Sequence, residues 1–350
     1  MIFEQSLQRE LSRTFTATVV VLVTIVMTMM LIRTLGLASK GSVNPQEVFL
    51  VMTYSVMGHL PTILTLSLFI TLVSTLSRIM RDSEMIIWLT SGQSVLSFLR
   101  PLFSFSTPIL ITIAVMALLV WPWTNGQMQD LRDRFEMRGD LERVTPGQFQ
   151  ESSNGKRVFY IDKDGSVTGS KNIFIASFEA NKQIITSARN GRIEVRGADK
   201  YLILDQGQRL ELDPIRESIK LTEFQQMGTS IGGSHLDAQL QQPKALPSLT
   251  LLQNPKPEHL GELAWRLSLA LAAINFVVLA LALSNHNPRT GRGGHLMFAL
   301  LTFVIYYNLI NAAQVWIGSG RMGMLTALIA LHGAALAIGM IWLARRQLRP

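Results

Sequence analysis

The sequence predicts an α-helical polytopic membrane protein of six transmembrane helices with an inserted all-β, jelly-roll-like domain. Long runs without a charged residue lie near both ends of the chain, and a charged, strand-rich segment separates them. Apolar residues make up 48% of the chain and charged residues only 16%, below the quarter that is usual in soluble domains. This composition favours a chain that spends most of its length in a membrane.

The charge-free runs have the length of membrane spans. Thr14–Ile32 holds nineteen residues, which extend roughly 28 Å as a helix, close to the thickness of the hydrocarbon core. Pro61 interrupts the second run, so its span is predicted at about Thr62–Ser77, with Gln46–His59 as an interfacial or kinked lead-in. The other runs are Val48–Ser77, Pro101–Gln129, Leu267–Pro288, Gly293–Gly320 and Met322–Ala344.

Basic residues in the short loops predict the orientation, because cytoplasmic loops are enriched in Lys and Arg. If the N-terminus is cytoplasmic, the opposite side receives only Arg33, Lys40 and Arg321 in its short segments. Both termini are therefore expected in the cytoplasm, and the segment between the third and fourth spans outside it. The ten cytoplasmic residues would be Arg9, Arg13, Arg78, Arg81, Arg100, Arg289, Arg292, Arg345, Arg346 and Arg349.

Short strand-like runs fill the segment between the third and fourth spans. Asn190-Gly191 and Gln206-Gly207 separate some of these runs and predict hairpin turns. About seven strands at this spacing favour a sandwich or a jelly roll. The runs are Arg157–Ile161, Asn172–Phe178, Gln183–Ala188, Arg192–Arg196, Tyr201–Leu204, Arg209–Leu212 and Ser218–Phe224.

Several classes of function are disfavoured by what the sequence lacks. The chain has no Cys and no P-loop motif, so thiolate chemistry is excluded and ATP binding by this motif is not expected. The predicted spans contain no Asp or Glu, which leaves little for proton-driven transport. The basic excess flanks apolar runs, so nucleic-acid binding is not expected. His286 and His295 share a loop, but solvated histidines explain them better than a metal does, and no cofactor is predicted.

The predicted cytoplasmic segment between the second and third spans has the features of a short docking helix. Glu84 follows a possible capping residue, and Gly92 can end the helix. Met85, Trp88 and Leu89 fall on one face, which suits a groove on a partner protein. A helix lying on the lipid surface explains the same pattern equally well.

The motifs of this chain together resemble the LptF/LptG (YjgP/YjgQ) family of lipopolysaccharide export permeases, and LptF in particular. The resemblance begins with Ser83-Glu84, Leu89 and Ser91-Gly92. It extends to Arg33-Thr34-Leu35-Gly36, Leu60-Pro61, Pro146-Gly147-Gln148-Phe149-Gln150 followed by Asn154-Gly155, and Asn287-Pro288-Arg289-Thr290-Gly291-Arg292. The order of three spans, a β-rich domain and three spans agrees over essentially the whole chain.

The resemblance implies a non-catalytic subunit of an ABC-type exporter in the inner membrane of a Gram-negative bacterium. Its partners would be an LptG-type permease, an LptB-type ATPase dimer, an LptC-type bitopic protein and an LptA-type periplasmic bridge. The complex would extract lipopolysaccharide from the inner membrane and pass it to the bridge. Residues 1–124 would hold the first three spans and a coupling helix at about 82–92, residues 125–262 the periplasmic domain and linker, and residues 263–350 the last three spans.

The resemblance also assigns site residues. Glu84, with Trp88 and Leu89, would couple the chain to the ATPase. Arg33 would meet the phosphates of lipid A, and Lys40 and Arg321 are further candidates for the same role. Ordinary anchoring to lipid headgroups explains Arg33 about as well, and a solvated turn explains Arg321 better.

Two apolar surfaces are candidates for contact with acyl chains. The first and fifth spans are expected to line a cavity, the fifth with Phe298, Phe303, Tyr306, Tyr307 and Trp316. The inward strand faces, predicted to include Phe159, Ile161, Phe174, Ile184 and Ile193, would form an open groove, or else an ordinary closed core. Two other functions fit the same architecture: a mechanotransmission permease that moves no lipid, and a membrane-anchored protein whose β domain binds a periplasmic partner.

Overall fold

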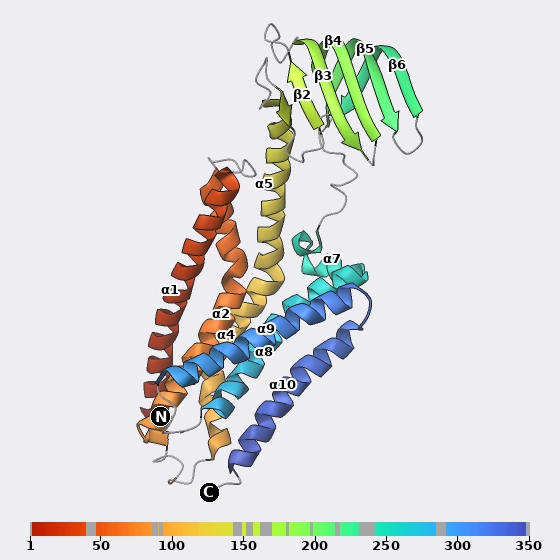
Figure 1. Ribbon diagram of the computed structural model, residues 1–350. Coiled ribbons are helices and arrows are strands. Elements are labelled where there is room, and N and C mark those ends of the chain that lie inside the picture. Colours follow the sequence, from red (N-terminus) through yellow and green to blue (C-terminus); the bar gives the residue numbers. More distant parts are fainter. Residues whose placement is uncertain are drawn as a thin grey trace. The chain divides into compact units, whose positions relative to one another are not determined.

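The computed structural model places the chain in two compact units. Unit 1 comprises residues 1–34, 49–128 and 242–350, and unit 2 comprises residues 35–48 and 129–241. Figure 1 shows helices in the first unit and a β-sheet in the second. The residues described are 2–39, 47–85, 90, 94–142, 149–151, 157–161, 170–179, 182–196, 199–213, 218–230, 242–284 and 292–347.

Six helical stretches of the described residues are long and apolar enough to cross a membrane, as the sequence predicts. The first two are the helices α1 (Ile2–Ser39) and α2 (Val48–Arg81). The third combines η2 (Val95–Phe98), α4 (Leu99–Val115), a π-helical turn η3 (Met116–Val120) and α5 (Trp121–Glu142). After the short elements η4 (Pro243–Ala245) and α7 (Ser248–Gln253) come α8 (Pro257–Leu283), α9 (Arg292–Gly318) and α10 (Met324–Gln347).

The second span differs from the expectation, because α2 continues through Pro61. A proline inside a helix removes one backbone hydrogen bond and commonly kinks the helix. Here Pro61 is buried, and the hydroxyl of Thr65 donates to the Pro61 carbonyl over 2.8 Å. Packing by neighbouring helices allows a membrane helix to tolerate such a residue. The apolar residues before Pro61 therefore belong to the same helix as those after it.

The core of unit 1 lies along α8 and α2. α8 packs against α4, α9 and α10. In its most apolar stretch of 18 residues, 72% of the residues are buried. Phe276 of α8 stacks on Phe69 of α2 with ring centroids 4.4 Å apart, and on Phe303 of α9 at 5.5 Å. At the start of the chain, Leu7 and Leu11 of α1 are buried in the same core. These two residues therefore pack the start of α1 against the other helices of unit 1.

Other helices present apolar side chains outward. Val20 and Ile32 of α1 and Ile329 of α10 are more than half exposed. Exposed apolar surface on this scale is unusual for a soluble monomer. It is what a helix in contact with lipid requires.

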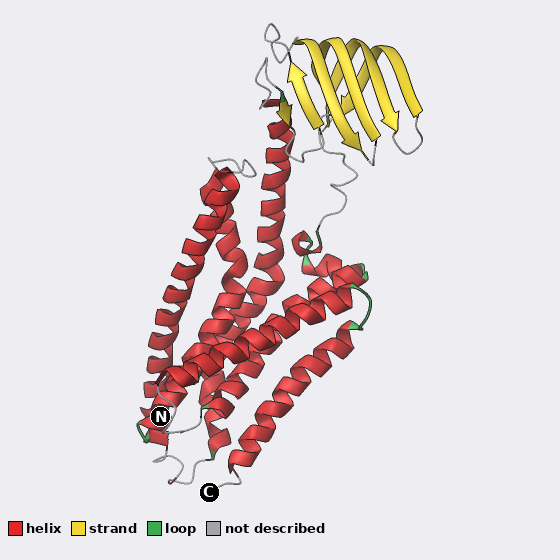
Figure 2. Cartoon of the chain, in the orientation of Figure 1, coloured by secondary structure: helices red, strands yellow, loops and turns green. Residues whose placement is uncertain are grey.

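Unit 2 contains an antiparallel sheet of six strands in sequential order, shown as arrows in Figure 2. The strands are β1 (Gln150–Glu151), β2 (Arg157–Ile161), β3 (Ser170–Glu179), β4 (Lys182–Arg196), β5 (Asp199–Asp213) and β6 (Ser218–Ser230). This confirms a membrane protein with an inserted β domain. The sequence favours a sandwich or a jelly roll, and the described strands form one sheet in which each strand pairs with its neighbours along the chain.

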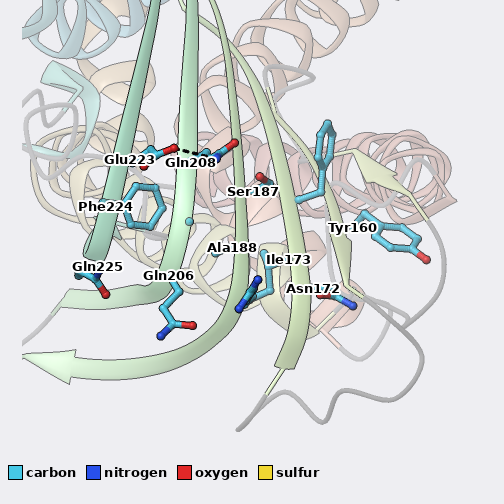
Figure 3. A pocket seen from close by; sticks show the side chains of 13 residues that line it. Tyr160, Asn172, Ile173, Ser187, Ala188, Gln206, Gln208, Glu223, Phe224 and Gln225 are labelled. Atoms are coloured by element: carbon cyan, nitrogen blue, oxygen red, sulfur yellow. Dashed lines mark hydrogen bonds between the residues drawn. The ribbon is translucent and has the colours of Figure 1, made fainter.

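The two predicted turns at Asn190-Gly191 and Gln206-Gly207 were wrong, because each lies inside a long strand. β4 and β5 each run for fifteen residues through these positions. The pairing of neighbouring strands skips one residue in each of the strands β3 to β6. The skipped residues form a row across the sheet: Asn172, Arg189, Gln206 and Gln225. Asn172 and Gln206 have positive φ values of 51° and 53°, a left-handed conformation that bends a strand locally. The strands curve in Figure 3 where Gln206 and Gln225 lie. We call this row the crease.

The crease changes which residues face the interior. Ala188 and Gly191 are both buried although they are three residues apart, whereas simple alternation would bury residues two apart. A Cβ on Gly191 would lie 2.2 Å from Cδ1 of Ile173, on the other side of the crease. The sheet therefore folds over a small core of Ile173, Ile175, Ala188, Leu202 and Leu204.

The strand register corrects one residue of the predicted inward face. Phe159 pairs with Ile175, and Ile161 pairs with Ile173, and both of these partners belong to the buried cluster. Phe174 pairs instead with Tyr160 and Ser187, on the opposite face. Ile184 and Ile193 pair with Ser177 and Leu202, which are both buried.

Candidate functional site

Glu84 lies directly after a tight turn that ends α2. Asp82 N donates to the Arg78 carbonyl over 2.9 Å, and Ser83 N donates to the Met80 carbonyl over 3.2 Å. Ser83 has φ 60°, a left-handed conformation that costs a non-glycine residue about 1–2 kcal/mol. The turn directs the chain back, so that a terminal nitrogen of Arg78 donates to Oε1 of Glu84 over 3.1 Å. The Glu84 side chain keeps 47% of its surface exposed.

The apolar face expected after Glu84 is only partly described. Met85 is fully buried in the core of unit 1, so it packs within the chain and is not available to a partner. Trp88 and Leu89 lie outside the described residues. The sequence pattern placed all three on one docking face, because it cannot distinguish an intramolecular apolar contact from an intermolecular one.

The basic residues expected to meet lipid phosphates lie on separate elements. Arg33 is exposed near the end of α1, where the neighbouring Thr34 is buried. Arg321 is exposed in the turn between α9 and α10, next to Gly320, which has φ 73°. Lys40 lies outside the described residues.

The aromatic residues predicted for the fifth span divide into two groups in α9. Phe303 and Tyr306 are buried in the helical core, at 7% and 5% exposure. Phe298 and Trp316 are about half exposed. Only the exposed group is free to touch acyl chains in this arrangement, and Tyr307 is intermediate.

A buried ion pair that the sequence reasoning missed lies in the first turns of α8. Oε1 of Glu262 accepts hydrogen bonds from Nε of Arg266 over 3.1 Å and from the Trp121 indole over 2.9 Å. Its Oε2 accepts from Gln314 of α9 over 2.9 Å. The charge-free run that predicted the fourth span starts at Leu267, after both charges. The Glu-x-x-x-Arg spacing nevertheless puts the two charges on one helix face.

Arg266 holds the short elements that precede α8. Its two terminal nitrogens donate to the carbonyls of Pro243, Lys244 and Leu246 and to the Ser248 hydroxyl, over 2.8 to 3.2 Å. Together with the bond to Glu262, these contacts use all five N–H groups of the guanidinium. Ser248 in turn donates to the Leu118 carbonyl over 2.6 Å. The chain entering the fourth span is therefore fixed to two helices.

A second buried polar cluster joins α8, α9 and α10. The Asn275 amide donates to the Tyr306 hydroxyl over 2.7 Å and to the His332 carbonyl over 3.0 Å. The His332 ring lies 2.7 Å from the same hydroxyl and 3.0 Å from the Ser268 hydroxyl. Each of the four side chains makes at least one of these hydrogen bonds, so the cluster links the three helices.

The β unit carries an open pocket of about 720 Å³ at the crease. Figure 3 shows side chains from β2 to β6 around it, with Gln208 donating to Glu223 over 3.1 Å. Tyr160, Phe174, Ser187, Gln208 and Glu223 share the face opposite the buried cluster. The pocket also reaches Ile173 and Ala188 of the buried cluster, so it lies at the crease and touches both faces of the sheet.

Six apolar helices, three on each side of an inserted antiparallel β unit, define a polytopic membrane protein with a large extramembrane domain between its third and fourth spans. The chain belongs to the family of lipopolysaccharide export system permeases LptF/LptG, whose match covers residues 6–346. It is similar to the lipopolysaccharide export system permease protein LptF of Escherichia coli K12, of Escherichia coli O157:H7 and of Shigella flexneri. Each is 24% identical over 328 residues, which cover 92% of this chain and 89% of the relative. The family match therefore makes it an inner-membrane permease of the lipopolysaccharide export system.

Proposed function

We propose that this chain is the permease subunit of an ABC-type exporter that extracts lipopolysaccharide from the inner membrane and passes it to a periplasmic bridge. The observation that carries the proposal is the family match over residues 6–346, which includes all six candidate spans and the β unit. The chain itself has no P-loop. A separate ATPase therefore supplies the energy, and the chain is not an enzyme.

The proposed partners follow from membership of this export system. They are an LptG-type permease that completes a heterodimer, an LptB-type ATPase dimer, an LptC-type bitopic protein and an LptA-type bridge. The proposed orientation has both termini in the cytoplasm and residues 125–262 in the periplasm, with the spans in residues 1–124 and 263–350. The basic residues of the short loops support this orientation.

Glu84, Trp88 and Leu89 are the proposed contact with the ATPase. The half-exposed carboxylate of Glu84 supports this role, because a charge-assisted hydrogen bond to a cation on the ATPase would be strong and directional. Arg33, Lys40 and Arg321 are the proposed contacts with lipid phosphates. The exposure of Arg33 and Arg321 supports this role, since a guanidinium can hold phosphate through two parallel bonds.

Purification of the tagged chain from native membranes in mild detergent tests the assembly. Mass spectrometry of the co-purifying proteins is expected to identify an ABC ATPase and a second six-span permease. An untagged strain, processed in parallel, gives the background. Recovery of the chain alone, or with periplasmic proteins but no ATPase, would contradict the exporter and favour a membrane-anchored binding protein.

A further inference from the structure

Arg78 joins three parts of the chain at the end of α2. Its Nε and one terminal nitrogen donate to the two carboxylate oxygens of Glu10 in α1. Its other terminal nitrogen donates to Oδ2 of Asp82 and to Oε1 of Glu84, each over 3.1 Å. One guanidinium therefore connects the first helix, the end of the second helix and the segment that begins at Glu84.

Only the planar fork of arginine can make this set of contacts. A guanidinium presents N–H groups along two edges, so one edge can bind Glu10 while the remaining nitrogen binds Glu84. A lysine is a single charged centre on a flexible stem, and it cannot hold both carboxylates in this geometry. The link between Glu10 and Glu84 thus depends on the chemistry of residue 78 and not on its charge alone.

Both sides of the link are fixed to the helical core. Leu7 and Leu11, on either side of Glu10 in α1, are 2% and 0% exposed. Met85, next to Glu84, is 0% exposed and belongs to the same core. Glu10 and Glu84 therefore cannot move freely about their own backbones, and a force on one is carried to the other through Arg78.

The cluster also leaves Glu84 accessible to a second cation. Three carboxylates, Glu10, Asp82 and Glu84, surround Arg78, and Arg81 lies 3.5 Å from Asp82. These five side chains carry two positive and three negative charges. The Arg78 bond uses Oε1 of Glu84, and 47% of the side chain remains exposed. A cation of a partner protein can therefore bind Glu84 while Arg78 stays on Glu10.

We propose that Arg78 is a positioning residue that ties the coupling carboxylate Glu84 to α1 through Glu10. This inference rests on the proposed function, in which Glu84 contacts the ATPase. When the ATPase moves Glu84, the Arg78 link carries the movement into α1, the helix that also bears Arg33. Without the link, the ATPase would still hydrolyse ATP, but less lipopolysaccharide would be released for each ATP hydrolysed.

The test measures lipopolysaccharide released per ATP hydrolysed, by the full complex in liposomes. Arg78→Gln and Glu10→Gln should each lower this ratio at least five-fold, while the ATPase rate stays within two-fold of the unchanged complex. Arg81→Gln is the matched control one turn along the same helix end, and it should leave the ratio unchanged. An unchanged ratio in both Arg78→Gln and Glu10→Gln would overturn the inference.

A charge swap separates positioning from simple packing of α1 on α2. The double variant Glu10→Arg with Arg78→Glu keeps an ion pair between the helices, but it places a carboxylate beside Glu84. It should assemble as the unchanged complex does, as judged by co-purification, and still show the lowered ratio. Full recovery of the ratio in this double variant would overturn the inference, because only the pairing of α1 with α2 would then matter.

Glu84→Ala in the same liposomes distinguishes failure of the proposed function from failure of this inference. If Glu84→Ala leaves the ratio unchanged, the coupling role of Glu84 is wrong, and the role of Arg78 is wrong with it. If Glu84→Ala lowers the ratio but Arg78→Gln and Glu10→Gln do not, the coupling role stands and only the link through Arg78 is refuted.

Discussion

Glu262 and Arg266 are the two buried charges of α8, and their energetics decide how that helix begins. Arg266 is 0% exposed and Glu262 is 2% exposed, and each is held by several hydrogen bonds. A buried ion pair gains little over an apolar pair, but removing one partner leaves the other charged and desolvated. The folded protein therefore needs both partners of the pair.

The first prediction follows from this asymmetry. Glu262→Ala is expected to destabilise the protein by about 3–5 kcal/mol, since the Arg266 guanidinium loses its counter-charge in a buried site. Thermal unfolding in detergent measures the effect. Glu258→Ala, in the exposed first turn of α8, is the matched control and should change stability little. Equal melting temperatures for the two variants would show that the buried pair does not stabilise the fold.

The second prediction concerns Arg33, whose proposed ligand is a phosphate. Arg33→Ala should weaken binding of fluorescent lipopolysaccharide to the complex about ten-fold, and Arg33→Lys should recover only part of the loss, because lysine lacks the planar fork. Arg100→Ala, an exposed arginine on the proposed cytoplasmic side, should bind normally. If Arg33→Ala and Arg100→Ala weaken lipopolysaccharide binding equally, Arg33 is only a general membrane anchor.

The sequence could not have located the long-range contacts of these polar clusters. Glu10 and Arg78 are 68 positions apart and Trp121 and Glu262 are 141 apart, so no local pattern joins them. Glu84 could be singled out because its signal is local: a charge that follows a possible capping residue and precedes an apolar face. The other end of its interaction, Arg78, looked like an ordinary basic residue at the cytoplasmic end of a span.

At the scale of elements, the apolar runs predicted membrane helices well and the polar dipeptides predicted turns badly. A charge-free run of about twenty residues is long enough to cross a membrane as a helix. The structure confirms six such helices among the described residues. Asn190-Gly191 is equally compatible with a hairpin and with a strand that needs a small residue where the Ile173 side chain crosses the crease. The choice depends on packing across the crease, which periodicity does not report.

The crease leads to the third prediction. A Cβ on Gly207 would lie 2.4 Å from the Ser187 carbonyl oxygen, a backbone atom that cannot easily move. Gly207→Ala should therefore destabilise the β unit by about 1–3 kcal/mol and speed hydrogen exchange of β5 amides in the full chain. Gly228→Ala, whose Cβ would meet only Cδ1 of Ile203 at 3.3 Å, is the control. Unchanged β5 exchange in Gly207→Ala would contradict the close packing at the crease.

At the scale of the whole molecule, the fourth prediction concerns orientation, and the absence of cysteine makes it simple to test. A single cysteine is then the only thiol available to a membrane-impermeant maleimide. Ser218→Cys in β6 should be labelled in spheroplasts, whereas Gln5→Cys in α1 should be labelled only after the inner membrane is opened. Both residues are exposed, so burial does not confuse the comparison. The reverse labelling pattern would contradict the proposed topology.

Two features of the molecule converge on one account of its action. The helical unit offers an accessible carboxylate, Glu84, that Arg78 links to α1, and the β unit offers an apolar core that includes Ile173 and Leu204. In the proposed function, Glu84 receives the input from the ATPase and the β unit passes on the lipid. A transport assay is needed to test whether the β unit takes part in lipid transfer.

The most direct measurement is therefore transport itself. Liposomes containing lipopolysaccharide and the purified complex are given ATP, and lipopolysaccharide that reaches a soluble periplasmic acceptor is quantified. The account predicts release that requires both ATP and this chain, and that falls at least ten-fold in Glu84→Ala. Release that proceeds equally well without this chain, or that is unchanged in its presence with or without ATP, would contradict the account.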